Sequence, residues 1–238
     1  MEFLRKIYLI VIYFFYLLFQ AFRVLKLKWI SKFKGSEAAE QYKNKALVKW
    51  AVGTNKIFGV KVTAIGQENI PDGAVVFISN HQSNFDTPVL IEAGAIAGFI
   101  SKKEVFKVPM LGYWMKQIHC VSVDRDNIRD AVKMIQNGVK NLKQGYSMLI
   151  FPEGTRAKDG VIKEFKNGSF KLATKAKVPI VPVTVDGTNM AYEYDGKLRK
   201  ANVTVTFHKP ISTENLSREE EKQLAETVHD IVATSLNK

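Results

Sequence analysis

The sequence predicts an α/β fold: a single domain with a mostly buried central sheet covered by helices, preceded by an N-terminal membrane-associating helical segment. Short apolar runs rich in β-branched residues alternate with longer helical patterns, which is typical of a sheet buried between helices. No internal repeat, low-complexity tract or Pro/Gly/Ser linker follows residue 35, whereas the residues before it differ sharply in composition. We therefore expect a membrane-anchoring segment at residues 1–35 and one domain at residues 36–238.

The apolar N-terminal stretch is the first expected element. The run from Ile7 to Phe19 is uncharged, and as a helix it would cover about 20 Å of the roughly 30 Å hydrocarbon core. An anchor that lies in the membrane plane or inserts halfway therefore fits better than a span. A cleaved signal peptide would need a small-residue cleavage site, which residues 20–28 lack, and a buried core helix stays open. Basic residues that would attract anionic headgroups follow the run: Arg23, Lys26, Lys28, Lys32 and Lys34.

The rest of the chain divides into expected strands and helices. The expected strands are residues 61–65, 74–79, 117–123, 146–151, 180–185 and 201–208. Helical patterns cover residues 36–57, 87–97, 128–144, 168–177 and 214–236. In the block 178–183, two prolines between apolar residues are also what an edge strand would tolerate. Because the loops that carry chemistry follow the ends of buried parallel strands, we expect reactive side chains in those loops.

Composition excludes several classes of protein. The chain has 238 residues, a net charge of +12 and 46% hydrophobic residues, which excludes disorder. One cysteine excludes an internal disulfide framework and a cysteine-rich zinc site, and the four scattered histidines show no metal-ligand spacing. The positive charge suits nucleic acid, an anionic membrane or an acidic substrate. Basic and aromatic residues are not interleaved as in nucleic-acid-binding proteins, so we expect no nucleic-acid partner.

A histidine and a carboxylate follow the expected strand at 74–79. His81 and Asp86 would lie on different faces of a continuous helix, so a shared site requires a turn between them. The polar residues after His81 supply such a turn, and Thr87-Pro88 supplies a helix start. The pair could then form the His-Asp half of a catalytic triad. The alternative is that Asp86 only caps the helix and His81 is a loop residue.

An anion site is expected after the strand at 146–151. There Gly154 and Arg156 share a loop in which backbone N–H groups and a guanidinium can face one oxyanion. Arg125 and Lys102 could add charge from neighbouring strand ends. Each of these two cations is equally explained as an ordinary surface residue, whereas the loop context sets Arg156 apart.

Four blocks together resemble the glycerophospholipid acyltransferase family, most of all the branch that acylates lysophosphatidic acid. They are N-H-x-x-x-x-D at 80–86, V-D-R at 123–125, F-P-E-G-T-R at 151–156 and V-P-I-V-P-V at 178–183. The resemblance implies transfer of an acyl group from acyl-CoA or acyl-ACP to the sn-2 hydroxyl of lysophosphatidic acid, giving phosphatidic acid. It implies no cofactor beyond the thioester co-substrate. It also fits a peripheral or monotopic enzyme at the cytoplasmic face of the cell membrane, in contact with the phospholipid bilayer.

The same resemblance implies roles for individual residues. His81 would be the general base and Asp86 would hold its tautomer, with no acyl-enzyme intermediate. The implied substrate-binding residues are Lys102, Arg125, Glu153, Gly154, Thr155 and Arg156. Two alternatives stay open: a family member acting on another lysolipid or glycerol phosphate, and a membrane-associated thioesterase that uses the same pair to activate water.

Overall fold

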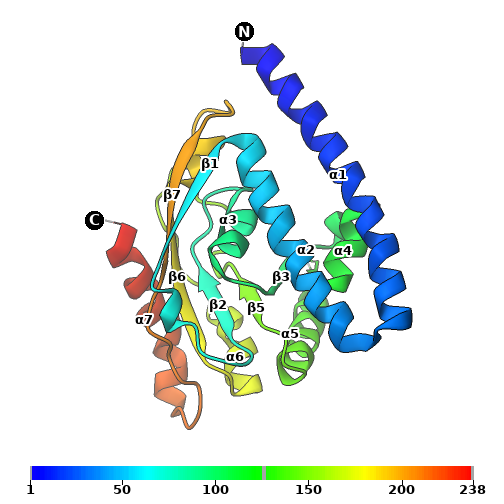
Figure 1. Ribbon diagram of the computed structural model, residues 1–238. Helices are drawn as coiled ribbons and strands as arrows, with labels where there is room; N and C mark the ends of the chain where they lie inside the picture. Colours follow the sequence, from blue (N-terminus) through cyan, green and yellow to red (C-terminus); the bar gives the residue numbers. More distant parts are fainter. Residues whose placement is uncertain (1, 125–126, 237–238) are drawn as a thin grey trace.

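A seven-stranded sheet forms the centre of the protein, with strand order β1-β7-β6-β2-β5-β3-β4 (Figure 1). The structure is a computed structural model that describes residues 2–124 and 127–236. The strands are β1 (Val60–Ile65), β2 (Val76–Ser79), β3 (Gly98–Lys102), β4 (Val121–Val123), β5 (Met148–Ile150), β6 (Ile180–Asp186) and β7 (Ala201–Phe207). The α/β fold predicted from the sequence is therefore confirmed.

Strand direction determines where the loops meet. Strands β6, β2, β5, β3 and β4 all run in parallel, whereas β7 is antiparallel to β6 and β1 is parallel to β7. The carboxyl ends of five strands therefore lie along one edge of the sheet, where α/β proteins bind their ligands. The loops that follow β2 and β5 both begin at this edge, so the two most informative motifs are brought together.

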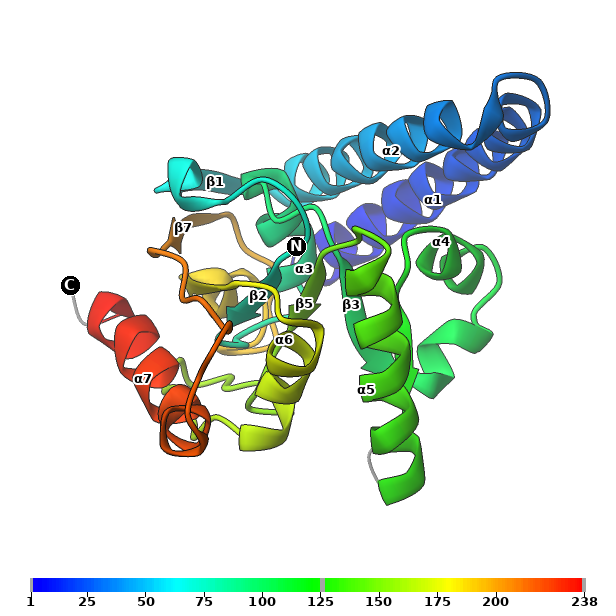
Figure 2. The same cartoon turned by 90° about the horizontal axis from the view of Figure 1, so that it is seen from below.

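Helices cover both faces of the sheet (Figure 2). On one face, α3 (Asp86–Ala93) and the end of α2 (Gly35–Phe58) pack over a core cluster that includes Phe77, Val89 and Leu149. On the other face, α5 (Ile128–Lys143), α6 (Lys171–Ala176) and α7 (Arg218–Leu236) enclose a second cluster that includes Ile78 and Val228. Strands β2 and β5 are buried along their whole length, as expected for strands in which every residue but Ser79 is apolar.

The segment from residue 87 to 123 differs from the prediction. The helix α3 ends at Ala93 rather than at residue 97, because Gly94 adopts a φ of 122°. A strand that was not among those predicted, β3, follows at Gly98–Lys102. The helix α4 (Leu111–Gln117) occupies the start of the expected strand, and β4 is confined to Val121–Val123 after His119 takes a left-handed φ of 61°. In such a short segment, burial between strands overrode local sequence preference.

The interpretation of the second proline as an edge-strand signal was wrong, because β6 lies inside the sheet between β7 and β2. Pro182 accepts a hydrogen bond at its carbonyl oxygen from His208 N at 3.0 Å. The pairing of β6 with β7 begins one residue later, at Val183. Pro182 accepts this bond but has no N–H to return to His208, so the proline ends the β6–β7 ladder at this pair.

The first helix extends well beyond the predicted apolar run. Helix α1 (Glu2–Phe33) is continuous over 32 residues and packs beside α2 in a helical hairpin (Figure 1). The hydroxyl of Tyr16 donates to Lys49 O at 2.9 Å, and Arg23 Nη1 donates to Ala46 O at 3.0 Å, so the middle of α1 is held against α2. By length and composition alone, Leu4–Phe33 is long and apolar enough to cross a membrane.

Candidate active site

His81 and Asp86 form a hydrogen-bonded pair at the carboxyl edge of the sheet. The Nδ1 atom of His81 lies 2.7 Å from Oδ2 of Asp86. Asp86 is fully buried, whereas the His81 side chain is 18% exposed. A carboxylate on Nδ1 assigns the ring proton to that nitrogen and leaves Nε2 with a free lone pair. The imidazole is therefore oriented to accept a proton from a bound molecule.

The turn predicted between the two residues is built by Asp86 itself. Its Oδ2 atom accepts hydrogen bonds from the backbone nitrogens of Gln82 at 2.7 Å and Ser83 at 2.9 Å. Both donors precede Asp86 in the chain, and α3 has no side-chain cap at its N-terminus. Asp86 thus orients the histidine loop rather than capping the helix.

A stacking contact on the face of the His81 ring also holds the imidazole in place. It stacks on the ring of Phe151, with centroids 4.1 Å apart and planes 14° apart. Phe151 follows β5 directly, so the first residue of the second motif supports the catalytic candidate of the first. The carbonyl of His81 also accepts a hydrogen bond from Ala157 N at 2.7 Å, which joins the two loops through their backbones.

Asn80 fastens the start of the histidine loop to the sheet. Its side-chain amide donates to the carbonyl of Val185 and accepts from the nitrogen of Val185, both at 2.8 Å. Asn80 is 1% exposed, and these two bonds satisfy its amide within the protein. An aspartate could not donate there and an aliphatic residue could do neither, which accounts physically for an asparagine before the histidine.

Glu153 supports the backbone of the site. Its Oε1 atom accepts from His81 N at 2.7 Å, and its Oε2 atom accepts from Lys163 N at 3.2 Å. Burial raises the pKa of the Glu153 carboxyl, and the two backbone N–H donors partly oppose that shift. Both oxygens are thus engaged by the backbone, one by the histidine loop and one by the segment after the F-P-E-G-T-R loop.

The remaining predicted residues of the F-P-E-G-T-R loop lie nearby. Gly154 adopts a φ of 73° and donates its N–H to Phe151 O at 3.1 Å, which makes the turn that reverses the loop. Thr155 is exposed and accepts from Lys163 Nζ at 3.4 Å. Lys102 is exposed at the end of β3, on the same edge of the sheet. Arg125 lies outside the described residues.

Arg156 is paired with a residue that the sequence analysis missed. Its Nη1 atom donates to Oε1 of Glu193 at 3.1 Å, and Glu193 is buried. A second missed residue, Thr188, donates its hydroxyl hydrogen to Oδ1 of Asp86. Both lie in the connection from β6 to β7, outside the four sequence blocks. A polar segment directly after a buried strand was the only sequence signal that pointed to them.

Comparison with known proteins agrees with this geometry. A family model described as Acyltransferase matches residues 61–186, which include the whole of both motif loops. The chain belongs to the acyltransferase family. The resemblance predicted from the four sequence blocks is therefore confirmed. The match ends just before Thr188 and Glu193, so the family model leaves the two missed residues outside its range.

Individual relatives are also similar to this acyltransferase. A probable 1-acyl-sn-glycerol-3-phosphate acyltransferase of Mycoplasma pneumoniae is 36% identical over 185 residues, 72% of this chain and 70% of the relative. A chloroplastic 1-acyl-sn-glycerol-3-phosphate acyltransferase of Arabidopsis thaliana is 38% identical over 175 residues, 71% of this chain and 49% of the relative. The corresponding Brassica napus chloroplastic protein is 40% identical over 61% of this chain and 44% of the relative. The chain thus spans about half the length of these chloroplast relatives.

A solved structure matches over the full length. The crystal structure of the 1-acyl-sn-glycerophosphate (LPA) acyltransferase PlsC from Thermotoga maritima superposes with a TM-score of 0.83 at 27% identity. The match covers 100% of this acyltransferase and 97% of the Thermotoga chain, so it includes the helical hairpin of α1 and α2.

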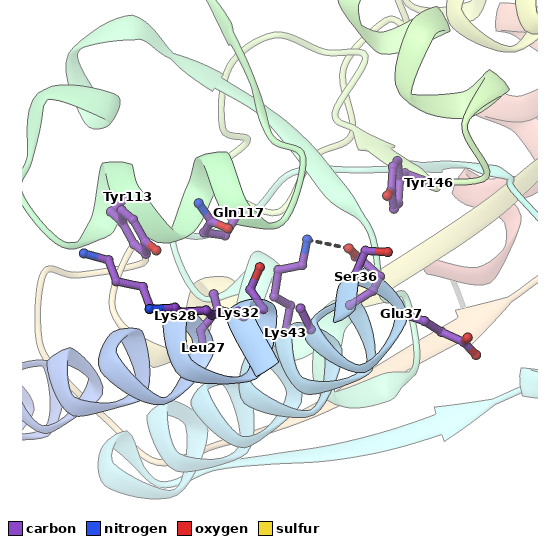
Figure 3. A pocket seen from close by; sticks show the side chains of 12 residues that line it. Leu27, Lys28, Lys32, Ser36, Glu37, Lys43, Tyr113, Gln117 and Tyr146 are labelled. Carbon is purple, nitrogen blue, oxygen red and sulfur yellow. Dashed lines mark ion pairs between the residues drawn. The ribbon is translucent and has the colours of Figure 1, made fainter. Parts of the chain in front are cut away.

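An apolar cavity and a polar hollow lie away from the motif loops in the described part of the acyltransferase. An apolar cavity of about 360 Å³ lies between α1, α2, β3 and α4, with Phe14, Trp50, Phe99 and Trp114 among its walls. A polar hollow of about 670 Å³ near the turn between α1 and α2 is lined by Lys28, Lys32 and Lys43 (Figure 3). Tyr146, which precedes β5, also lines the polar hollow, so that hollow lies at the opposite end of the strand from His81.

Among the described residues, no group of three or more His, Cys, Asp or Glu side chains could hold a metal ion.

Proposed function

We propose that this acyltransferase moves a fatty acyl group from a thioester of coenzyme A or acyl carrier protein to the sn-2 hydroxyl of lysophosphatidic acid. The product is phosphatidic acid, and the role is in phospholipid synthesis. The proposal depends above all on the His81–Asp86 pair, whose free nitrogen lies on the same sheet edge as the Arg156 loop. The names of the relatives and of the Thermotoga structure support the choice of acceptor.

In the proposed reaction His81 is the general base. Its Nε2 atom takes the proton of the acceptor hydroxyl while the oxygen attacks the thioester carbonyl carbon. The new C–O bond forms, the C–S bond breaks, and the imidazolium returns the proton to the departing thiolate. Asp86, held by three further hydrogen bonds, stabilises the imidazolium without taking its proton. The steps balance without an acyl-enzyme, a metal or a prosthetic group.

We assign binding of the acceptor phosphate to Arg156, with Lys102 and Arg125 as additional cations. The Arg156 side chain is 33% exposed and Glu193 occupies only its Nη1 atom, so donors remain for a ligand. Guanidinium groups bind phosphate with two parallel hydrogen bonds, which makes Arg156 the best suited of the three. Glu153, Gly154 and Thr155 would shape the loop that presents Arg156.

We assign the apolar cavity to an acyl chain. Its walls are almost entirely hydrocarbon and aromatic, and burial of each methylene there would contribute about 0.8 kcal/mol. Phe99 lines the cavity and pairs with Leu149 of β5, two residues before Phe151. A tail in the cavity would thus extend toward the ring on which His81 stacks.

We propose that α1 holds the enzyme on the cytoplasmic face of the cell membrane as a peripheral or monotopic protein. One side of α1 packs on α2, and the other presents exposed apolar residues, including Phe15, Phe22 and Trp29. A helix tied to its own domain at its middle and near its start favours an orientation in the membrane plane. Near its start, Lys6 lies 3.5 Å from the hydroxyl of Tyr192, the neighbour of Glu193, so the membrane helix begins beside the proposed phosphate site.

The decisive experiment follows acyl transfer from labelled acyl-CoA and acyl-ACP to lysophosphatidic acid in detergent micelles. Wild-type protein should make phosphatidic acid, and His81→Ala should lose about two to four orders of magnitude in kcat. His229→Ala, on the distant helix α7, is the matched control and should retain activity. Release of free fatty acid without an acceptor would identify a thioesterase instead. Transfer only to another lysolipid or to glycerol 3-phosphate would change the acceptor but keep the reaction.

A further inference from the structure

Glu193 is a buried carboxylate that joins both motif loops. It is 2% exposed and comes from the connection between β6 and β7, far in sequence from either loop. Its Oε1 atom accepts from Arg156 Nη1 at 3.1 Å and from Asn84 N at 2.9 Å. Its Oε2 atom accepts from the hydroxyl of Ser83. One side chain therefore touches the histidine loop twice and the arginine loop once.

A carboxylate suits this arrangement because one of its partners is a guanidinium, which makes that hydrogen bond charge-assisted. Three donors converge on two oxygens, and one of the donors is a guanidinium. A glutamine would keep one acceptor for Arg156 and Asn84 and could donate its NH₂ group to the Ser83 hydroxyl, so it would remove mainly the charge that strengthens the Arg156 bond. Burial of a charge is costly unless a partner and hydrogen bonds compensate it, and Arg156 together with the two loop donors supplies both.

The pairing leaves Arg156 free to bind. Glu193 contacts the guanidinium only at Nη1, while a guanidinium carries five N–H donors. The arginine side chain is partly exposed, so its other edge faces solvent. Its carboxylate partner is buried and tied to the backbone of Asn84, so the guanidinium is held in one orientation before any ligand arrives. Preorganisation of this kind raises affinity because the side chain loses less freedom on binding.

We infer that Glu193 is a positioning residue that aims Arg156 at the acceptor phosphate and fixes its place relative to the His81–Asp86 loop. The inference rests on the proposed function and adds a residue to it. Ser83 and Asn84 lie between His81 and Asp86, so the carboxylate that orients Arg156 also holds the turn that orients the base. Glu193 thus sets the spacing between the phosphate and the hydroxyl that loses its proton.

The test compares Glu193→Gln with a matched control on the same connection. Asp195→Asn also removes one carboxylate, but Asp195 pairs with Arg199 rather than with either motif loop. Steady-state kinetics with lysophosphatidic acid and acyl-CoA should show a KM for the acceptor raised about tenfold in Glu193→Gln, with the KM for the donor within about twofold. Inhibition by glycerol 3-phosphate should weaken in parallel. Asp195→Asn should match wild type in all three quantities.

Two further variants, Glu193→Asp and Arg156→Lys, test the same role of Glu193. If Glu193→Gln does not fold, Glu193→Asp keeps the charge and should raise the same KM. In a double-mutant cycle, Glu193→Gln should cost little once Arg156→Lys is present, because both changes break one interaction. A lower acceptor KM in Glu193→Gln would mean that Glu193 competes with phosphate, and an equal loss for donor and acceptor would mean a merely structural role. Either result overturns the inference alone, whereas wild-type protein that is inactive toward lysophosphatidic acid overturns the proposed function together with it.

Discussion

The hydroxyl of Thr188 donates a hydrogen bond to Oδ1 of Asp86, although the two residues are 102 positions apart. Thr188 is fully buried and begins the short helical turn Thr188–Ala191 after β6. Asp86 already receives two backbone N–H groups and His81 on its other oxygen. Thr188 therefore engages the one carboxylate oxygen that the histidine loop leaves unmatched, and it fixes the rotation of the carboxylate group.

Thr188→Val should lower kcat about tenfold while leaving KM values nearly unchanged. Valine has almost the same shape but no hydroxyl, so Asp86 would keep its charge and lose a donor on a buried oxygen. The loss should destabilise the fold by about 1–3 kcal/mol, the cost of an unsatisfied buried polar group. Acyl-transfer kinetics and urea unfolding measure the two effects. Thr188→Ser, which keeps the hydroxyl, is the control and should restore most of the kcat.

The sequence could predict the parts of the site that lie within single loops. His81, Asp86 and Arg156 each follow a buried apolar strand, and parallel pairing brings such strand ends to one edge. It could not predict Thr188 or Glu193, because their roles depend on how the β6–β7 connection folds back over both loops. Nor could spacing show that Glu153 uses its carboxylate on the backbone of His81.

The same holds for the fold: elements with a strong pattern of their own could be predicted, whereas elements that depend on contacts between distant segments could not. Strands that are almost entirely apolar, such as β2 and β5, can be recognised from the sequence as buried. The strand β3 and the helix α4 have no strong period of their own, and the cavity between α4 and the α1–α2 hairpin depends on contacts between distant segments. The sequence also did not show that α1 continues to Phe33, because the second half of the helix is basic and resembles a segment that only flanks the apolar run.

The exposed apolar face of α1 should control membrane binding. Phe15 and Phe22 are 61% and 65% exposed, and burial of each ring in a bilayer would contribute about 1.5–3 kcal/mol. The double variant Phe15→Ser/Phe22→Ser should therefore bind vesicles at least about a hundredfold more weakly, with little change in melting temperature. Sedimentation with vesicles of mixed zwitterionic and anionic lipid measures this. The control is Val132→Ser/Val161→Ser, which removes two exposed apolar side chains elsewhere and should bind like wild type. Equal binding by both double variants would contradict the anchor.

Cys120 should be almost inert in the folded protein. Burial raises the pKa of the Cys120 thiol to about 12, and the hydrogen bond from Phe99 N opposes this only in part. A raised pKa favours the neutral thiol, so the reactive thiolate should be about a thousandfold scarcer at pH 8 than for an ordinary cysteine. The rate of reaction with a thiol-specific disulfide reagent, native against urea-unfolded, measures this. The unfolded chain serves as the internal control, and equal rates in the two states would show that the thiol is accessible and ionised.

His119 should make stability depend on pH on the acid side of neutrality. Its ring stacks on Tyr146 at 3.5 Å, and its Nε2 atom lies 3.5 Å from Lys43 Nζ and 3.4 Å from Glu40 Oε1. Burial first, and then the charge of Lys43, lower the pKa of His119, while Glu40 opposes them. The folded state therefore binds fewer protons than the unfolded state between the lowered pKa and 6.5.

The sign follows from that difference in protons bound. The stability that neutral His119 contributes is complete above pH 6.5 and is lost as the pH falls toward the lowered pKa. His119→Asn removes the titrating group and still tolerates the left-handed φ of 61°. The free energy of unfolding of wild type should therefore fall relative to His119→Asn as the pH drops from 7.5 to 5, measured by urea unfolding at each pH. A difference in free energy of unfolding that stays constant over this range would contradict the prediction. His119 would then have the same proton affinity in the folded and unfolded chain.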